Sequence, residues 1–321
     1  MIISDQLIEK VLIDPIKEGC NALWIVSGYS SPSMFYAHRE WCTNQDLPMP
    51  EISLLVGMTA REGMNRIAHQ GFVKASQLRS TSFECRYVVE GSAVHSKVYA
   101  WTRDGQPIRG FIGSANYSQN AFGSAQREVL HEIDAVAAEL YVHNLFSRGL
   151  DCETENIHEL LTLHDMPFTD LGPLLNQPDI GSNWSDLPQQ VSLPLFTDRG
   201  EMRVPARSQL NWGQREGRNP NQAYLKIPIE LHRTGFFPEL GIHFTLLTDD
   251  GEVFDCVRAQ EWGKALETPE SNALLGEYFR RRIGVASGAP VELEDLQKYG
   301  RTDVTIFRTS NSEYKLDFSV N

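Results

Sequence analysis

The first half of the chain alternates short apolar segments with longer amphipathic ones, and this alternation limits its possible folds more than any other feature. The segment NALWIVSGYSS has the pattern of a buried strand that runs into a Gly-Ser turn, and the helical pattern PSMFYAHREWC follows it. EISLLVGM and then TAREGMNRIAHQGFVKASQL repeat the same order. Strands that alternate with helices are typical of an α/β sandwich. We therefore predict an α/β sandwich over residues 1–150.

The pattern changes after residue 150. Residues 151–192 are irregular and rich in Pro, Asp, Gly and Asn, which is typical of a linker. From residue 193 on, the short alternating segments YLKIPIEL, HFTLLTDDGEVFDCVRAQ, TDVTIFRTS and YKLDFSV are joined by turn residues. Only SNALLGEYFRRRIGV has a convincing helical pattern there. These features predict a mainly β domain, a small barrel, over residues 193–321.

The composition limits the cellular compartment and the cofactors. Hydrophobic residues make up 41% of the 321 residues, which supports a buried core, and no run of about 18 apolar residues is present to span a membrane. The charged, amphipathic start MIISDQLIEKVLIDPIKEG indicates an opening helix rather than a secretory signal. The five cysteines are scattered without a CxxC pair, which argues against a disulfide framework and a zinc site. We expect a cytoplasmic protein with no metal ion and no cofactor.

The charge distribution allows a nucleic-acid ligand although the net charge does not favour one. The net charge is −13, which argues against DNA binding by the chain as a whole. From residue 195 to the end, however, 16 Lys and Arg stand against 19 Asp and Glu, so the acidic excess lies mainly in the first half. Five arginines cluster in this C-terminal part, at Arg199, Arg203, Arg207, Arg215 and Arg218. Because screening acts within roughly 8–10 Å, a local basic face can bind DNA.

The stretch AVHSKVYAWTRDGQPIRGFIGSANYS, residues 93–118, brings polar side chains onto a predicted hairpin. VHSKVYAW alternates, which puts His95 and Lys97 on one side of a strand. RDGQP has the Asp-Gly chemistry of a tight turn, and IRGFIGSAN returns as a second strand that ends in a Gly-Ser turn. If the two strands pair, His95, Lys97 and Asn116 meet near one end of the sheet.

These residue types suit attack at a phosphodiester. The reaction needs a nucleophile, a proton donor for the leaving oxygen, and fixed donors for the phosphoryl oxygens. Near neutral pH, His95 can be either the nucleophile or the proton donor. Lys97 can hold one non-bridging oxygen, and Ser114 and Asn116 can donate to the others. Glu128, in QREVLHEI, is the candidate carboxylate that fixes the tautomer of His95.

Other polar residues of the first half have ordinary structural interpretations. His69, His131 and His143 are interpreted as structural or surface residues, and Asp134 as a solvent-facing or N-cap residue. For the turn GYSS, residues 28–31, two interpretations stay open: it lines the pocket, or it is only a turn at the end of a strand.

HxK followed by GSxN and then by Glu128 resembles the half-site of the phospholipase D superfamily. The resemblance implies a metal-independent reaction in two steps through a phosphohistidine, in which one His95 attacks and His95 of the partner subunit protonates the leaving oxygen. The sequence contains one HxK and GSxN half-site, so the resemblance implies a homodimer whose active centre lies across a two-fold interface. The sequence departs from the family's longer pattern at Thr102, where the family often has Asp.

Two segments of the second half are candidate DNA-binding arms: RVPARSQLNWGQREGRNPNQAYLKIP and CVRAQEWGKALETPESN. Arg pairs bidentately with guanine and Asn or Gln with adenine, while Ser and backbone amides hold phosphates. The alternative is a solvated polar loop, and Arg280–Arg282 are interpreted as salt-bridged surface residues or phosphate contacts. The candidate DNA-binding residues are Arg203, Arg207, Ser208, Asn211, Trp212, Gln214, Arg215 and Arg218 in the first arm, and Arg258, Gln260, Trp262 and Lys264 in the second.

Together the two halves resemble restriction endonucleases of the NgoFVII and BfiI type. These join an N-terminal phospholipase D-like nuclease to a C-terminal B3-like pseudobarrel that binds double-stranded DNA in the major groove with two arms. The resemblance implies Mg²⁺-independent cleavage and, for some members, a separate ATPase subunit. This chain has no GxxxxGK[ST] motif of its own.

Two alternative functions stay open. A phosphatidyl-transferase or phospholipase of the same superfamily predicts a membrane-facing apolar patch and usually two half-sites in one chain. A non-catalytic DNA-binding regulator predicts a degenerate nuclease site, whereas His95 and Lys97 are both intact here.

Overall fold

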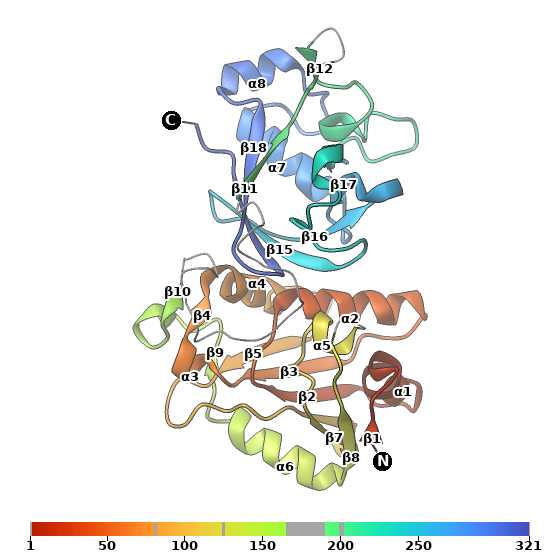
Figure 1. The fold of residues 1–321 in the computed structure, drawn as a ribbon, viewed down its shortest axis with the longest axis vertical. Helices are drawn as coiled ribbons and strands as arrows, with labels where there is room; N and C mark the ends of the chain where they lie inside the picture. The colour runs from red at the N-terminus through yellow and green to blue at the C-terminus, as the bar shows by residue number, and fades with distance from the viewer. Residues whose placement is uncertain (1, 80–81, 124–125, 165–189, 199–201, 321) are drawn as a thin grey trace. The chain divides into compact units, whose positions relative to one another are not determined.

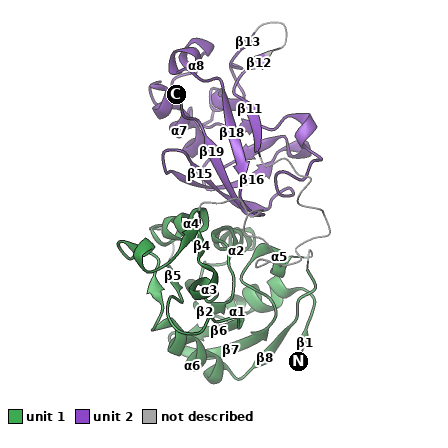
Figure 2. Ribbon diagram, turned by 60° about the vertical axis from the view of Figure 1, so that its left-hand side comes forward, with its two compact units in different colours: residues 1–166, 173–181 green, residues 167–172, 182–321 purple. Residues whose placement is uncertain are grey.

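The computed structural model describes residues 2–79, 82–123, 126–164, 190–198 and 202–320. These residues form two compact units, one before residue 165 and one from residue 190 on, which Figure 2 colours separately. Within this part of the chain no helix is long and apolar enough to cross a membrane, and no group of three or more His, Cys, Asp or Glu side chains could hold a metal ion. All five cysteines are buried and free.

An eight-stranded mixed sheet forms the centre of the first unit. Its strands, in order across the sheet, are β1 (Ile2–Ile3), β8 (Leu130–Ile133), β7 (Gln106–Gly113), β6 (Val98–Arg103), β2 (Ala22–Ser27), β3 (Glu51–Val56), β5 (Phe83–Tyr87) and β9 (Leu150–Asp151). β2, β3 and β5 are parallel, and the other neighbouring pairs are antiparallel. The two apolar segments that are each followed by a helix thus become the adjacent parallel strands β2 and β3.

Helices cover both faces of this sheet (Figure 1). The helical segments are η1 (Ile8–Ile13), α1 (Asp14–Lys17), α2 (Pro32–Asn44), α3 (Thr59–Glu62), α4 (Arg66–Ser76), α5 (Gln119–Phe122), α6 (Ala135–Phe146) and η2 (Ile157–Glu159). α6 packs on one face, over a core that includes Val98 and Ala100. Tyr99 and Trp101 lie in the larger core on the other face, where α2 and α4 pack. The predicted α/β sandwich is confirmed, as is the alternation of side chains in β6.

The segment TAREGMNRIAHQGFVKASQL forms two helices, α3 and α4, where the pattern predicts one. Gly63 separates them with a φ of 72°, a left-handed conformation that glycine adopts at little cost. The next two residues form β4 (Met64–Asn65), which pairs in parallel with β10 (Leu163–His164). The side chain of Asn65 then accepts hydrogen bonds from two backbone N–H groups in the first turn of α4 and caps that helix.

β6 and β7 form the predicted hairpin. Arg103 pairs with Gln106, so the turn consists of Asp104 and Gly105. Their φ angles are both positive, 50° and 76°, which fits the type I′ turn that an Asp-Gly pair favours.

The strand predicted from Val94 begins only at Val98. Upstream of it, the chain crosses the end of β3, where the N–H of Val94 donates to the carbonyl of Gly57 at 2.9 Å. A Cβ atom on Gly57 would lie 2.0 Å from the carbonyl oxygen of Val94, so only glycine allows this approach. His95 and Lys97 therefore lie in the segment that precedes β6, at the edge of the sheet.

The folded part of the first unit extends past residue 150, the predicted domain boundary. β9 pairs with β5, Cys152 and Leu161 are buried in the core, and β10 pairs with β4. Residues 151–164, which we predicted as the start of a linker, therefore pack on the first unit. The rest of the predicted linker up to residue 189 lies outside the described residues.

A seven-stranded sheet forms the second unit and curls into a nearly closed barrel. Its strands, in order, are β11 (Gln190–Pro194), β18 (Asp303–Arg308), β19 (Glu313–Asp317), β15 (His243–Thr248), β16 (Val253–Ala259), β17 (Ala265–Glu267) and β14 (Leu225–Lys226). β15 and β19 are parallel, the other pairs are antiparallel, and the edge strands β11 and β14 lie against each other. Phe236, Phe244 and Tyr314 fill the interior. The predicted mainly β barrel is confirmed.

Shorter elements complete this unit. A small hairpin joins β12 (Thr197–Asp198) to β13 (Met202–Arg203), and the 3-10 turns are η6 (Gln209–Asn211), η7 (Ile229–Leu231) and η8 (Glu261–Gly263). α7 (Ala273–Ile283) is the helix that the sequence predicts. α8 (Leu293–Tyr299) is a helix that the sequence analysis missed, although the Glu292–Asp295 capping box and the left-handed Gly300 at its end are recognisable signals.

Arg280 ties α7 to the loops around it. It is only 1% exposed, and its guanidinium donates to the carbonyls of Leu210 at 3.1 Å, Gly276 at 3.1 Å and Ala289 at 2.7 Å. The interpretation of Arg280 as a surface residue is therefore wrong, because its donors are needed inside the unit. Arg282 does form an ion pair, with Asp249 at 2.8 Å.

We expect Arg280→Ala to lower the free energy of unfolding by about 3 kcal/mol or more, because several buried carbonyls lose their donor. Arg281→Ala is the matched control on the same helix: it removes partly exposed ion pairs and should cost about 1 kcal/mol or less. Urea unfolding of the two full-length variants measures the difference. Equal losses would contradict the assigned role of Arg280.

Candidate active site and candidate DNA-binding arms

Three chain segments meet at one edge of the first sheet and build the candidate site. They are the turn after β2, the segment before β6, and the turn after β7. A Cβ atom on Gly28 would lie 3.0 Å from Cδ2 of His95 and 3.5 Å from Oδ1 of Asn116. The end of β2 is therefore in contact with both residues, and GYSS lines the site.

His95 and Lys97 are in direct contact. Lys97 is 5% exposed, and its Nζ donates to the backbone carbonyl of His95 at 2.7 Å and lies 3.0 Å from Nε2 of the imidazole. The imidazole itself is exposed. Partial burial and then the charge of Lys97 lower the pKa of His95 from its usual value, while the negative charge of Glu62 opposes them. The neutral, nucleophilic form of His95 is favoured as a result.

The amide oxygen of Asn116 is held at the end of β2. The N–H of Tyr29 donates to Oδ1 at 3.1 Å, and the hydroxyl of Ser27 donates to the same atom at 3.4 Å. These donors identify Oδ1 as the oxygen, so the end of the amide that can donate to a ligand is Nδ2.

Ser114 and Glu128 form a pair beside Lys97. The Ser114 hydroxyl donates to the Glu128 carboxylate and accepts from the N–H of Val129 at 3.0 Å. Burial lowers the pKa of Lys97, and the negative charge of Glu128 opposes this shift. We expected Glu128 to hold the imidazole of His95; instead, its carboxylate bonds to Ser114 and its charge acts on Lys97. All five predicted catalytic residues nevertheless lie around one edge of the sheet.

Glu62 is a site residue that the sequence did not indicate, whereas Tyr29 belongs to the turn GYSS, for which lining the pocket was one of the two interpretations. The ring of Tyr29 meets that of His95 edge-on, with centroids 5.8 Å apart, and its hydroxyl donates to Glu62 at 2.9 Å. Burial first, and then the bond to Glu62, raise the pKa of Tyr29 to about 12. Glu62 ends α3, whose approach to the site depends on the break at Gly63. No sequence pattern indicated this approach.

The interpretations of the other polar residues are confirmed. His69 is buried and contacts the Tyr87 hydroxyl at 3.1 Å, whereas His131 and His143 are exposed. Asp134 is the N-cap of α6.

The first candidate arm is held in place by part of its own predicted DNA-binding residues. Asn211 is 1% exposed, and its amide bonds to both the carbonyl and the N–H of Val291 at 2.8 Å. Gln214 donates to the carbonyls of Pro220 and Gly288 at 3.0 Å. These two side chains are engaged within the unit, so we do not retain them as base readers.

The exposed residues of the first arm are mainly arginines. Arg218 lies over the ring of Trp212, 4.3 Å from its centroid, and Arg215 donates to the carbonyl of Arg207 at 2.8 Å. The side chains of Arg207, Arg215 and Arg218 are exposed, as is that of Arg203 on β13, while Ser208 and Trp212 are half-buried. The first arm thus presents four arginines to solvent.

The second candidate arm is a strained turn that is held by hydrogen bonds from two of its own side chains. The guanidinium of Arg258 donates to the carbonyls of Pro238 at 3.2 Å and Gly263 at 3.4 Å, and Gln260 donates to Glu267 at 2.6 Å. Both predicted DNA-binding residues therefore hold the turn. Trp262 is 77% exposed at its tip, with a φ of 64°, and Lys264 is also exposed.

The two arms flank one two-strand ladder. The first arm leads into β14 and the second into β17, and these strands pair antiparallel, with Leu225 opposite Leu266. Because antiparallel strands start at opposite ends of their ladder, the arms enter it from its two ends.

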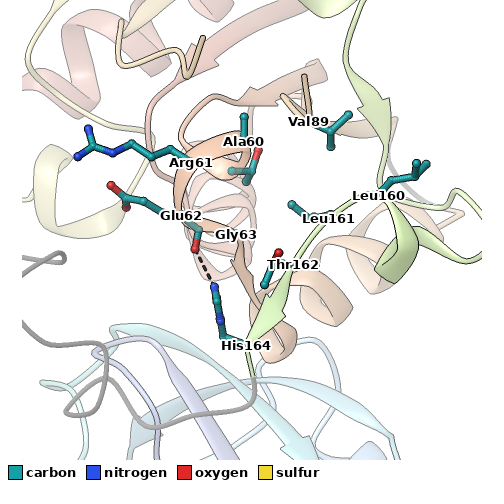
Figure 3. Close-up of a pocket in the computed structure, with 10 residues that line it drawn as sticks. Ala60, Arg61, Glu62, Gly63, Val89, Leu160, Leu161, Thr162 and His164 are labelled. Carbon is teal, nitrogen blue, oxygen red and sulfur yellow. Dashed lines mark hydrogen bonds between the residues drawn. The ribbon is translucent and has the colours of Figure 1, made fainter. Parts of the chain in front are cut away.

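The cavity next to Glu62 does not include His95. It has a volume of about 160 Å³ and is lined by α3, by Val89, by Leu160–Thr162 and by His164, which bonds to the carbonyl of Glu62 (Figure 3). Its walls come from the elements that fix α3.

Comparison with known proteins relates both units to one type of enzyme. Residues 5–159 match the NgoFVII restriction endonuclease N-terminal PLD domain, and residues 186–310 match the NgoFVII C-terminal B3-like DNA-binding domain. No curated protein matches the chain.

Two solved structures are similar to part of the chain. NucT from Helicobacter pylori has 16% identity and a TM-score of 0.32, over 47% of this chain and 97% of that one. Polyphosphate kinase from Porphyromonas gingivalis has 10% identity and a TM-score of 0.30, over 46% of this chain and 21% of that one. The two family matches, one to each half and in this order, show that the chain belongs to the NgoFVII-type restriction endonucleases, with a phospholipase D-like and a B3-like domain.

Proposed function

We propose that this chain cuts double-stranded DNA at a specific sequence, without a metal ion, through a covalent phosphohistidine at His95. The observation that carries the proposal is the contact between the exposed imidazole of His95 and the buried ammonium of Lys97, with the amide of Asn116 nearby. These residues supply a neutral nucleophile and fixed donors for a phosphoryl group.

In the first step a ring nitrogen of His95 attacks phosphorus, a P–N bond forms, and the P–O bond to the leaving oxygen breaks. The imidazolium of His95 of the partner subunit gives its proton to that oxygen. Lys97 and Asn116 hold the non-bridging oxygens, whose negative charge they stabilise.

In the second step water attacks the phosphohistidine. The imidazole of His95 of the partner subunit is now neutral and accepts the water's proton, and the P–N bond breaks. Both histidines return to their starting protonation states, and the DNA is left with one phosphate end and one hydroxyl end. The nucleophile, the acid and the positive charge all come from protein side chains.

We expect the purified chain to cut plasmid DNA into discrete fragments in excess EDTA, and His95→Ala to bind the same DNA without cutting it. Gel electrophoresis measures the cleavage, and a mobility shift measures the binding. His69→Ala is the matched control, because this histidine lies in the core away from the site and its loss should spare cleavage.

Cleavage by His95→Ala at the wild-type rate would overturn the proposal and favour a DNA-binding regulator. Some members of the family act with a separate ATPase subunit, and cleavage by the purified chain alone would show that this one needs none.

The proposed dimer has a candidate interface beside the half-site. Tyr141 on α6 is 42% exposed and its hydroxyl contacts that of Ser96, next to His95, at 2.8 Å. Val129, 47% exposed, adjoins Ser114 and Glu128. Other exposed apolar side chains are Ile112 on β7, the strand that precedes Ser114, and Val136 and Leu140 on α6, the helix that carries Tyr141. Exposed apolar surface at the rim of an incomplete site fits a second copy of the chain.

We expect Leu140→Glu to convert a dimer into a monomer and to abolish cleavage, because the charge would be buried in the interface. Leu160→Glu is the matched control, since Leu160 is an exposed leucine elsewhere on the first unit. Sedimentation and plasmid cleavage measure the two effects. A wild-type chain that cuts DNA as a monomer would contradict the shared centre.

The four exposed arginines of the first arm are the proposed DNA contacts, together with Lys264 and Trp262 of the second. We expect Arg207→Ala or Arg215→Ala, where the side chain reads a base edge, to cost about 1–3 kcal/mol in specific binding and to relax one position of the site. Lys298→Ala, which removes an exposed cation on α8, is the control and should leave binding unchanged. Binding to a panel of substituted duplexes measures both. Unchanged affinity in both arm variants would remove this arm from the interface.

A further inference from the structure

Tyr29 contacts two of the proposed catalytic residues, Asn116 and His95, and also Glu62. Its N–H holds Oδ1 of Asn116 at 3.1 Å, its ring packs edge-on against His95, and its hydroxyl donates to Glu62 at 2.9 Å. A single residue thus connects the amide, the imidazole and a carboxylate that come from three different segments.

We propose that Tyr29, anchored by Glu62, is the positioning residue that aligns Asn116 with His95, and that the carboxylate of Glu62 supplies the negative charge that offsets Lys97 at His95. The proposal rests on the nuclease function above and deepens it. Glu128 does not fill this role, since its carboxylate bonds to Ser114.

Glu62, which anchors Tyr29, is itself held by a contact with His164 of β10. Glu62 ends α3, and its backbone carbonyl accepts a hydrogen bond from Nε2 of His164 at 2.8 Å (Figure 3). A Cβ atom on Gly63 would lie 2.5 Å from the same Nε2 atom, so α3 and β10 are in close contact. β10 pairs with β4 directly after this point. The backbone of Glu62, from which its carboxylate reaches Tyr29, is therefore held in place.

Two opposite charges act on the imidazole. Lys97 disfavours the protonated form of His95 and Glu62 favours it, while partial burial works in the direction of Lys97. Burial and Glu62 raise the pKa of the Tyr29 hydroxyl, and the positive charge of Arg61 opposes them. Burial lowers the pKa of Lys97, and the negative charge of Glu128 opposes this shift. The carboxylate of Glu62 is bonded to the hydroxyl of Tyr29, whose ring packs edge-on against His95, so removing this carboxylate takes away a negative charge close to the imidazole.

Two conservative variants separate the two parts of the proposal. Tyr29→Phe keeps the ring and the charge of Glu62 but breaks the bond between them. Glu62→Gln keeps an acceptor for the Tyr29 hydroxyl but removes the charge. The matched controls are Tyr87→Phe, which removes a buried tyrosine hydroxyl in the core, and Glu51→Gln, which removes an exposed charge at the opposite end of β3.

The experiment is an NMR titration of the imidazole signals of the full-length protein, with His95→Ala used to assign the His95 signal. We expect Glu62→Gln to lower the pKa of His95, because the charge that stabilises the imidazolium is lost. The neutral nucleophile then persists to lower pH, so the acidic limb of kcat/KM for DNA cleavage moves to lower pH as well.

We expect Tyr29→Phe to lower kcat by about tenfold or more with little change in KM, since misaligned groups still bind DNA. The two controls should match wild type in titration and in kcat. An unchanged pKa of His95 in Glu62→Gln, or an unchanged kcat in Tyr29→Phe, would overturn the proposal. A wild-type chain that cuts no DNA, either alone or with an ATPase subunit, but shows the shift in the Glu62→Gln titration would instead overturn the nuclease function and leave the charge relation between Glu62 and His95 supported.

Discussion

The candidate site depends on a buried lysine ammonium placed against an exposed histidine. Moving an ammonium out of water costs several kcal/mol unless it regains polar contacts. Lys97 regains them from the carbonyl and the ring of His95, at 2.7 and 3.0 Å, with Glu128 as the nearby opposite charge. The same contact disfavours a protonated imidazole, because two like charges would meet. The positive charge and the proposed nucleophile are therefore provided together by one short segment.

The backbone around this segment explains why so few residues suffice. Gly57 lets Val94 pass close to the end of β3, and Gly28 lets the end of β2 approach both His95 and Asn116. The type I′ turn at Asp104 returns the chain to the same edge, where β7 ends. The site is thus a product of tight backbone contacts at one sheet edge, and the rest of the unit supports those contacts.

The features of the first unit that depend on local sequence patterns could be predicted from the sequence. Alternation in β6 and the Asp-Gly turn indicated the hairpin, and the HxK and GSxN motifs indicated His95, Lys97 and Asn116. The sequence did not predict Glu62 or its bond to Tyr29, because this contact depends on the break at Gly63 and on pairing between β4 and β10, which are distant in sequence. Such non-local contacts leave no periodic signal.

The same limit applies to the second unit. The sequence does not distinguish a polar side chain of an arm that faces DNA from one that bonds to the backbone of its own unit. Asn211 and Arg258 turn inward and hold the arms, whereas Arg215 and Arg218 remain exposed. Composition indicated an arm of this kind, but only the fold separates the residues that support it from those that are free to bind.

The central claim is that His95 becomes covalently attached to DNA, and trapping that intermediate tests it most directly. Radiolabelled DNA is mixed with the full-length protein, the reaction is quenched within one turnover, and the labelled peptide is sequenced. We expect a label on the peptide that contains His95, through a linkage that is labile in acid and stable in alkali, as a phosphoramidate is. Labelling at another residue, or rapid cleavage without any labelled protein, would contradict it.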